Sequence, residues 1–282
     1  MTLGESVARG EAQLRAGPHP DRARRDAETL LLHLIGRNRA WLLSHLDDDF
    51  AGCRSIGYAG LLDRRFRGEP IQYITGQTEF YGLPLRVTPD VLIPRPETEH
   101  LVEEVLKRGA TVAEPRIVDV GTGSGAIAIA LAHAWPLAKL TAIDRSENAL
   151  AVARGNAQRA GFADRIRFLQ GDLLGPVAAE QFEIVVSNPP YVPATDRASL
   201  AVEVREYEPP LALFAGDDGL DVYRRLIPQT CGVVVPDGLV ALEIGFGQAK
   251  AVEQLLAESG FAEIEFAPDL QGIPRVVTAH RE

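Results

Sequence analysis

From about residue 100 onward, short apolar runs alternate with longer segments in which apolar residues recur at helical spacing. Seven of these runs predict strands, and helical segments fill most of the gaps between them. Because this alternation is typical of βαβ units, it predicts a mostly parallel, doubly wound α/β sheet. The predicted strands are residues 116–120, 139–144, 165–170, 182–187, 239–244, 262–266 and 275–280, and the predicted helices include 126–134, 148–160 and 248–259.

The last two predicted strands, 262–266 and 275–280, are joined by a loop that is too short to contain a helix. Parallel neighbours need a connection of about a dozen residues or more, so these two strands are predicted to pair antiparallel. The expected sheet is therefore mostly parallel with an antiparallel last strand.

The first 75 residues have an all-helical pattern instead. One helix is predicted to begin at Pro20 and to end at Gly36, and residues 40–46 and 58–66 predict two more helices of a small bundle. Glycines and prolines then interrupt short alternating runs, which we interpret as a hairpin-like connector. The predicted domains are a helical domain over 1–75, a hairpin linker over 76–99 and an α/β domain over 100–282.

Composition and charge exclude several classes of protein. The 282 residues, 46% hydrophobic and 24% charged, are typical of a soluble globular chain of about two domains. Cys53 and Cys231 form neither a disulfide framework nor a zinc site, and no other metal site is expected. We find no secretory leader and no long apolar run, and we expect a cytoplasmic protein without a membrane span. The net charge of residues 76–282 is −11, against +1 for residues 1–75, which disfavours binding to duplex nucleic acid.

Residues 117–125, IVDVGTGSG, place glycines at alternate positions where a buried strand is expected to pass into a helix. Gly121, Gly123 and Gly125 allow a tight turn and the close approach of a ligand, and Thr122 and Ser124 lie between them. Three glycines in five residues disfavour a turn without a ligand. The spacing satisfies a relaxed dinucleotide pattern, so the loop predicts a site for NAD or for S-adenosylmethionine without choosing between them.

Two acidic residues end the next two predicted strands. Asp144 is placed to accept hydrogen bonds from both hydroxyls of a ribose, although Asp144 and Ser146 also precede a helix and either could cap it. Asp172 is placed to accept from an adenine amino group with Leu173 packed on the ring, and a plain cap after the strand is a nearly equal alternative. The register of Asp144 with the glycine loop favours its ribose role.

The sequence Asn188-Pro189-Pro190-Tyr191 follows the apolar run 182–186. The two prolines fix φ and remove two backbone donors, which leaves carbonyl groups free to face a cleft. Asn188 adds a side-chain oxygen, and Tyr191 adds a flat ring and a hydroxyl. Such a group can hold a planar –NH2, accept both of its hydrogens and direct its lone pair at an electrophile. Hydride transfer needs no such arrangement, and a rigid turn without function is the weaker alternative.

These motifs together resemble the peptide chain release factor glutamine methyltransferases, the HemK/PrmC family, over nearly the whole chain. The motifs that carry the resemblance are RRFRGEPIQYITG at 64–76, Glu79-Phe80, LIPRPETE at 92–99, the glycine loop, Asp144 and the Asn-Pro-Pro-Tyr sequence. The last of these also occurs in DNA adenine methyltransferases, so the 92–99 stretch is the more specific marker. Leu173 departs from the pattern, because some relatives have an aromatic residue there, next to the adenine.

The resemblance implies an N-terminal helical domain that docks the substrate, a hairpin linker and a Rossmann-like methyltransferase domain. It implies S-adenosylmethionine as the methyl donor and, as acceptor, the side-chain nitrogen N(5) of the Gly-Gly-Gln glutamine in class 1 peptide chain release factors. The residues expected at the cofactor are Gly121, Thr122, Gly123, Ser124, Gly125, Asp144, Asp172, Leu173 and Asn188, and those expected at the acceptor amide are Asn188, Pro189, Pro190 and Tyr191.

The donor is already activated, so the expected catalysis is mainly positioning, which can lower a barrier by up to about 7–11 kcal/mol. Two other hypotheses remain open from the residues. One is an N(6)-adenine methyltransferase that acts on nucleic acid, because adenine also presents a planar –NH2. The other is a non-catalytic module that docks on a translation factor through the helical bundle, which the retention of every motif residue disfavours.

Overall fold

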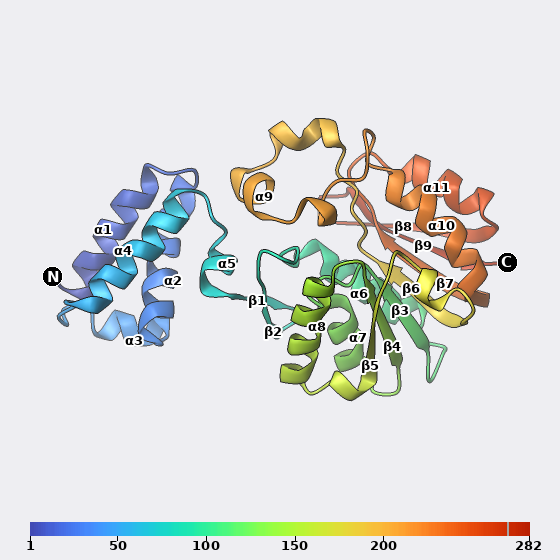
Figure 1. Cartoon of the computed structure of the whole chain (residues 1–282), viewed down its shortest axis with the longest axis horizontal. Helices are drawn as coiled ribbons and strands as arrows, with labels where there is room; N and C mark the ends of the chain where they lie inside the picture. Colours follow the sequence, from blue (N-terminus) through green and yellow to red (C-terminus); the bar gives the residue numbers. More distant parts are fainter. Residues whose placement is uncertain (270) are drawn as a thin grey trace. The chain divides into compact units, whose positions relative to one another are not determined.

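The computed structural model describes residues 1–269 and 271–282, and the side chain of Cys53 lies outside the described part (Figure 1). The chain divides into two compact units. The first consists of residues 1–77 and 200–207, and the second of residues 78–199 and 208–282. None of the helices among the described residues is long and apolar enough to cross a lipid bilayer.

The first unit is a bundle of helices around buried leucines such as Leu30 and Leu31, which are fully buried. A short helix from far along the chain, α9, belongs to this unit. Its Glu203 lies 3.0 Å from the guanidinium of Arg65, which also bonds Asp26 at 2.6 Å and is itself only 2% exposed. The helices of the unit are α1 (Leu3–Arg15), α2 (Ala23–Ile35), α3 (Arg39–Ser44), α4 (Cys53–Phe66), α5 (Ile71–Thr75) and α9 (Val202–Tyr207).

Helix ends in this unit agree with the predicted ones better than helix starts do. Gly36 ends α2 in the left-handed conformation, at φ 64°, as predicted. The predicted start at Pro20 is wrong for the α-helix, because Pro20 opens a short 3-10 turn (Pro20–Arg22) and α2 begins at Ala23. Helix α4 begins at Cys53, five residues before the predicted start, without a side-chain cap that could have marked it.

The predicted hairpin is present, and it follows the helices of residues 1–75 in the chain. Strands β1 (Gln77–Phe80) and β2 (Leu83–Arg86) form a two-stranded sheet. The two residues that join them, Tyr81 at φ 53° and Gly82 at φ 71°, are both left-handed, as the tightest hairpin turns require.

The second unit is built on a seven-stranded sheet in the order β5-β4-β3-β6-β7-β9-β8. Strands β3 to β7 run parallel, and β9 runs antiparallel to both of its neighbours, which confirms the predicted α/β fold with an antiparallel last strand. The strands are β3 (Arg116–Val120), β4 (Lys139–Asp144), β5 (Ile166–Gln170), β6 (Phe182–Ser187), β7 (Val234–Glu243), β8 (Phe261–Pro268) and β9 (Pro274–Arg281).

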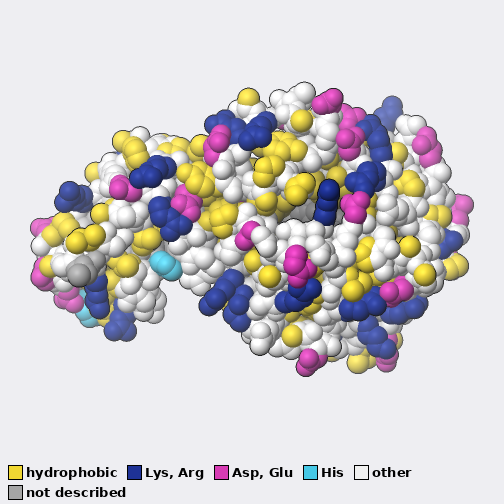
Figure 2. All heavy atoms as spheres, viewed as in Figure 1, with side chains coloured by type: hydrophobic (Ala, Val, Ile, Leu, Met, Phe, Trp, Pro, Cys, Tyr) yellow, Lys and Arg dark blue, Asp and Glu magenta, His cyan; other side chains and the backbone are white. Residues whose placement is uncertain are grey.

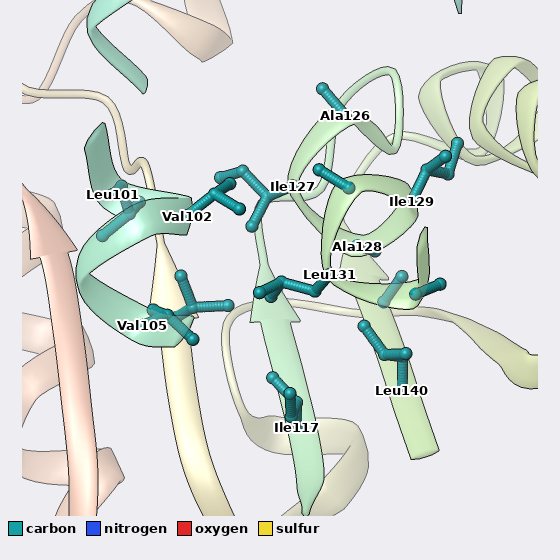
Figure 3. Close-up of a cluster of buried hydrophobic side chains, with 14 of the residues drawn as sticks. Leu101, Val102, Val105, Ile117, Ala126, Ile127, Ala128, Ile129, Leu131 and Leu140 are labelled. Carbon is teal, nitrogen blue, oxygen red and sulfur yellow. The ribbon is translucent and has the colours of Figure 1, made fainter. Parts of the chain in front are cut away.

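Helices cover both faces of this sheet, so alternate residues of its central strands enter different cores. Ile117 of β3 packs with α6 and α7 in one core, which Figure 3 shows, and the next residue, Val118, packs with α10 and α11 in the other. The strands are therefore apolar on both sides, as parallel strands usually are. The helices of this unit are α6 (Glu97–Arg108), α7 (Ala126–Ala134), α8 (Glu147–Ala160), α10 (Asp221–Val233) and α11 (Ala249–Glu258).

Four strands begin elsewhere than predicted, and β8 and β9 each begin one residue early. Strand β5 begins at Ile166, because Arg165 closes a 3-10 turn and its guanidinium bonds the backbone carbonyls of Ala132 and Trp135 at the end of α7. Strand β7 begins at Val234, five residues before the predicted start. The sequence did not predict this part because it contains Pro236 and Gly238, which are unusual inside a strand. The pairing of β7 with β6 also has an irregularity in register there.

Asp119, inside β3, is a fully buried acid in the middle of this apolar sheet. Its Oδ2 accepts a hydrogen bond of 2.6 Å from the Thr122 hydroxyl. Burial nevertheless raises the pKa of Asp119 to about 7, because the charged carboxylate is poorly solvated there. An unfolded aspartic acid ionises near pH 4, so between about pH 4 and 7 the folded chain keeps a proton that the unfolded chain releases.

This difference predicts a stability that falls as the pH rises. The contribution of protonated Asp119 is complete below about pH 4 and is lost as the pH approaches 7, at up to about 1.4 kcal/mol per pH unit. Asp119→Asn keeps an acceptor for the Thr122 hydroxyl and cannot ionise. Denaturant unfolding between pH 5 and 8 should therefore show a shallower decline for Asp119→Asn than for the wild type. Parallel curves for the two proteins would contradict the assignment.

Candidate functional site

The carboxyl ends of the central strands form one edge of the sheet, where the strand order reverses. Strand β3 lies between β4 and β6, and its last residue, Val120, pairs with Ser187, the last residue of β6. The Ser187 hydroxyl also donates to the Val120 carbonyl at 2.7 Å. The glycine loop and the Asn-Pro-Pro-Tyr loop therefore start side by side, at the point where ligands bind in open α/β sheets.

A cavity of about 370 Å³ lies at this edge. Its size is within the range of small-molecule sites. Among the predicted site residues, those that line it are Gly121, Gly123, Asp144, Asp172, Leu173, Asn188 and Pro190. Sequence reasoning missed further lining residues, among them Asp90, Leu211, Phe214 and Arg225, which belong to loops and a helix without a recognisable motif.

The three glycines of the loop have two different tasks. Gly121 and Gly123 have φ of 73° and 54°, so only glycine holds their backbone without strain, and a side chain added at Gly121 would meet no atom within 4 Å. A Cβ at Gly125, by contrast, would lie 3.1 Å from Cβ of Ala153 in α8 and 3.2 Å from Ile129. Gly121 and Gly123 thus leave open space at the cavity, whereas Gly125 permits close packing of α7 and α8.

Asp144, at the end of β4, fastens the glycine loop from the side. Its Oδ2 accepts from the Gly123 N–H at 2.9 Å, and its Oδ1 accepts from the Ser146 N–H at 2.8 Å. The cap of α8 is Ser146, whose hydroxyl accepts from the Ala149 N–H at 3.2 Å. Burial raises the pKa of the Asp144 carboxyl, against the backbone hydrogen bonds that lower it. Asp144 is therefore not needed as the helix cap and lies in the cavity wall.

The remaining residues predicted at the cofactor are placed less uniformly. Asp172 lines the cavity and forms an ion pair with Arg225 of α10, and both side chains are about half exposed. Leu173 lines it with a left-handed backbone at φ 50°. Thr122 and Ser124 are buried and are absent from the described residues that line the cavity. The Ser124 carbonyl instead accepts from Asn156 Nδ2 at 2.8 Å.

The Asn-Pro-Pro-Tyr loop is anchored at both ends. Asn188 Nδ2 donates to the Thr98 hydroxyl oxygen at 3.0 Å, and the Tyr191 hydroxyl donates to Glu243 Oε1 at 3.1 Å. The Tyr191 carbonyl accepts from Gln248 Nε2 at 2.9 Å. Pro189 is buried and Pro190 lines the cavity, whereas Tyr191 is not among its lining residues in the described chain.

Thr98 and Glu243 were not singled out from the sequence. Thr98 lies in the first turn of α6, within the LIPRPETE stretch, and Glu243 is the last residue of β7. The Thr98 hydroxyl donates to Glu243 Oε2 at 2.6 Å. Glu243 could have been found from the sequence, because it is an acid at the end of a long apolar run. Burial raises the pKa of both Glu243 and Tyr191, and the neighbouring Glu243 charge raises that of Tyr191 further.

The structure resembles solved methyltransferases in fold. It matches a methyltransferase from Pyrococcus furiosus with a TM-score of 0.53 and 18% identity over 71% of this chain and 89% of that one. It matches a T. thermophilus 16S rRNA N2 G1207 methyltransferase, solved with AdoMet and guanosine, with a TM-score of 0.54 and 17% identity over 73% and 50% of the two chains. At these identities the likeness concerns the fold alone.

Sequence relatives are closer. Residues 5–76 match the PrmC N-terminal domain family, and residues 96–204 match the methyltransferase small domain family. A release factor glutamine methyltransferase of Moorella thermoacetica is 43% identical over 100% of this chain and 99% of its own length. One of Geobacter sulfurreducens is 42% identical over 91% and 89%. With such identity over the full length, this chain is a methyltransferase and belongs to the release factor glutamine methyltransferase family.

Proposed function

We propose that this chain transfers a methyl group from S-adenosylmethionine to the side-chain nitrogen N(5) of the glutamine in the Gly-Gly-Gln motif of class 1 peptide chain release factors. The observation that carries the proposal is the position of Asn188. Asn188 lines the cavity that the glycine loop also lines, because β3 and β6 are paired neighbours. Membership of the family supports the release factor as the partner, since the relatives are named for that substrate.

The residues around the cavity fit S-adenosylmethionine. The open space at Gly121 and Gly123 admits a ligand against the backbone, and Asp144 offers carboxylate oxygens to a ribose. Asp172 and Leu173 would hold the adenine, with Asp172 shared between the ligand and Arg225. Thr122, Ser124 and Gly125 would act by shaping the loop. Bound S-adenosylmethionine would supply a methyl group activated by a positively charged sulfur.

The chain's own task is to prepare the amide nitrogen. An amide nitrogen is a poor nucleophile because its lone pair is delocalised into the carbonyl group. Asn188 Oδ1 and a backbone carbonyl of residues 188–191 would accept its two hydrogens and aim the lone pair, while Pro189 and Pro190 keep the loop rigid. Tyr191, which is not among the described residues that line the cavity, would help to hold the loop through its hydroxyl bond to Glu243. Its raised pKa keeps the phenol protonated at neutral pH, so it orients rather than abstracts a proton.

An N(6)-adenine methyltransferase would use the same –NH2 chemistry, so charge decides between the acceptors. The net charge of −11 over residues 76–282 opposes a polyanion, whereas the nearly neutral residues 1–75 suit a protein surface. Positive and negative side chains are interspersed over the face shown in Figure 2. We therefore propose that residues 1–75 dock the release factor, that residues 76–99 link them to the catalytic domain, 100–282, and that duplex nucleic acid is not a substrate. The reaction is proposed to take place in the cytoplasm, where release factors act.

Asp144 and Ser146, which lie at and just after the end of β4, are proposed to have different roles. Asp144→Ala removes the carboxylate from the cavity wall and should weaken S-adenosylmethionine binding by more than about 10-fold, or 1.4 kcal/mol. Ser146→Ala removes the cap of α8 and should lower the free energy of unfolding by about 1 kcal/mol while changing the affinity far less. Calorimetric titration and denaturant unfolding measure both effects. Equal losses of affinity in the two variants would refute the ribose role of Asp144.

The acceptor is tested by offering labelled S-adenosylmethionine and the purified protein three substrates in parallel. These are a class 1 release factor, the same factor with its Gly-Gly-Gln glutamine replaced by alanine, and duplex DNA. Label should enter the unaltered release factor alone, because the other two lack the glutamine amide. Label on the DNA would support the adenine methyltransferase, and label on the altered factor would refute the glutamine assignment.

A further inference from the structure

Glu243 is a buried acid for which the proposed reaction has no direct use. It is 2% exposed and ends β7, beside the loop that follows β6. Both of its carboxylate oxygens accept hydrogen bonds, Oε2 from Thr98 and Oε1 from Tyr191. Burial raises the pKa of Glu243 and Glu97 raises it further, against these two hydrogen bonds and the charge of Arg275, which lower it. Because a carboxylate oxygen only accepts hydrogen bonds, both groups that are bonded to this carboxylate must act as donors.

The Thr98 hydroxyl connects Glu243 with Asn188 and thereby fixes which group donates in each hydrogen bond. Thr98 has a single hydroxyl hydrogen, and at 2.6 Å this hydrogen is given to Glu243. Toward Asn188 the hydroxyl can therefore offer only a lone pair, which must be met by an N–H. Asn188 meets it with Nδ2 at 3.0 Å. The other atom of the same planar amide, Oδ1, is thereby left to face away from Thr98.

We propose that Glu243 and Thr98 are positioning residues that select which atom of the Asn188 amide faces the acceptor nitrogen. The inference rests on the proposed function, in which Asn188 Oδ1 accepts a hydrogen of the glutamine –NH2. Rotation of the Asn188 amide by 180° would present its own –NH2 to that –NH2, donor against donor. An asparagine alone does not discriminate between the two orientations, because its oxygen and nitrogen have nearly the same shape.

The Glu243 carboxylate also bonds Tyr191, at the other end of the Asn-Pro-Pro-Tyr loop. Tyr191 donates to Oε1 of Glu243 while Asn188 is held, through Thr98, from Oε2. One carboxyl group therefore holds both polar side chains of the Asn-Pro-Pro-Tyr loop. Because Glu243 and Thr98 are predicted to act through Asn188 and Tyr191, their loss should lower the rate of methyl transfer more than the binding of either substrate.

The test compares Thr98→Val with Thr98→Ser in the full-length protein. Valine keeps the shape of threonine without its hydroxyl, and serine keeps the hydroxyl. With a class 1 release factor as acceptor, Thr98→Val should lower kcat by about 10-fold or more, in the range found when the hydrogen-bond partner that orients a functional side chain is removed. KM for the release factor and the affinity for S-adenosylmethionine should stay within about 3-fold, and Thr98→Ser should restore kcat to within about 3-fold of the wild type.

A double-mutant cycle with Asn188→Ala separates positioning from a general loss of structure. Asn188→Ala alone should lower kcat by about 10²–10³-fold, as the loss of a preorganised hydrogen bond usually does. Adding Thr98→Val to it should cost nothing further, because no amide remains to be oriented. If the double variant instead lowers kcat by the product of the two single effects, the proposal for Thr98 is overturned and the role of Asn188 stands. An unchanged kcat in Asn188→Ala would instead overturn the proposed function. If Thr98→Val does not fold, Thr98→Ala serves in the same cycle.

Discussion

The site depends on the parallel pairing of β3 with β6. Val120 and Ser187 are partners in register and are joined again by the Ser187 hydroxyl. The next residues along the two strands, Gly121 and Asn188, belong to the two loops that line the cavity, so a single pairing brings together the loops proposed to hold the methyl donor and the acceptor. A slip of this register by one residue would turn every side chain of β6 to the opposite face and offset the two loops.

Three acids, of which Asp119 and Glu243 are buried and Asp144 is partly buried, hold the loops at this edge of the sheet in place. Asp119 accepts from Thr122 inside the glycine loop, Asp144 accepts from the Gly123 N–H, and Glu243 accepts from Thr98 and Tyr191. Burial raises the pKa of all three acids, which is the electrostatic cost of placing them there. Each acid holds a loop that must stay rigid to position a substrate, so the polar network gives geometry rather than stability to this part of the molecule.

The sequence was most informative where the signal is local. The periodicity of apolar residues predicted the sheet strands, with β3, β4 and β6 at their observed bounds, and the short link before β9 predicted its antiparallel pairing. The glycine spacing predicted a loop at the cavity, but it did not show that Gly125 packs α7 against α8. Strand starts were missed where a residue such as Pro236 contradicts the strand pattern.

Contacts between distant segments could not be predicted from one sequence. Thr98 and Glu243 are 145 residues apart, and neither has a local pattern that points to the other. The same holds for the ion pair of Arg65 with Glu203, which places residues 200–207 in the first unit although the sequence suggested a boundary at residue 75. Such pairs follow from the topology of the chain, which brings together residues that sequence patterns describe only one at a time.

The central claim is that the cavity at the carboxyl ends of β3, β4 and β6 binds S-adenosylmethionine. Calorimetric titration of the full-length protein with S-adenosylmethionine and, separately, with NAD tests this claim most directly, because the glycine spacing alone permits either ligand. We expect saturable binding of one S-adenosylmethionine per chain and no binding heat from NAD. Saturable binding of NAD with no response to S-adenosylmethionine would contradict it.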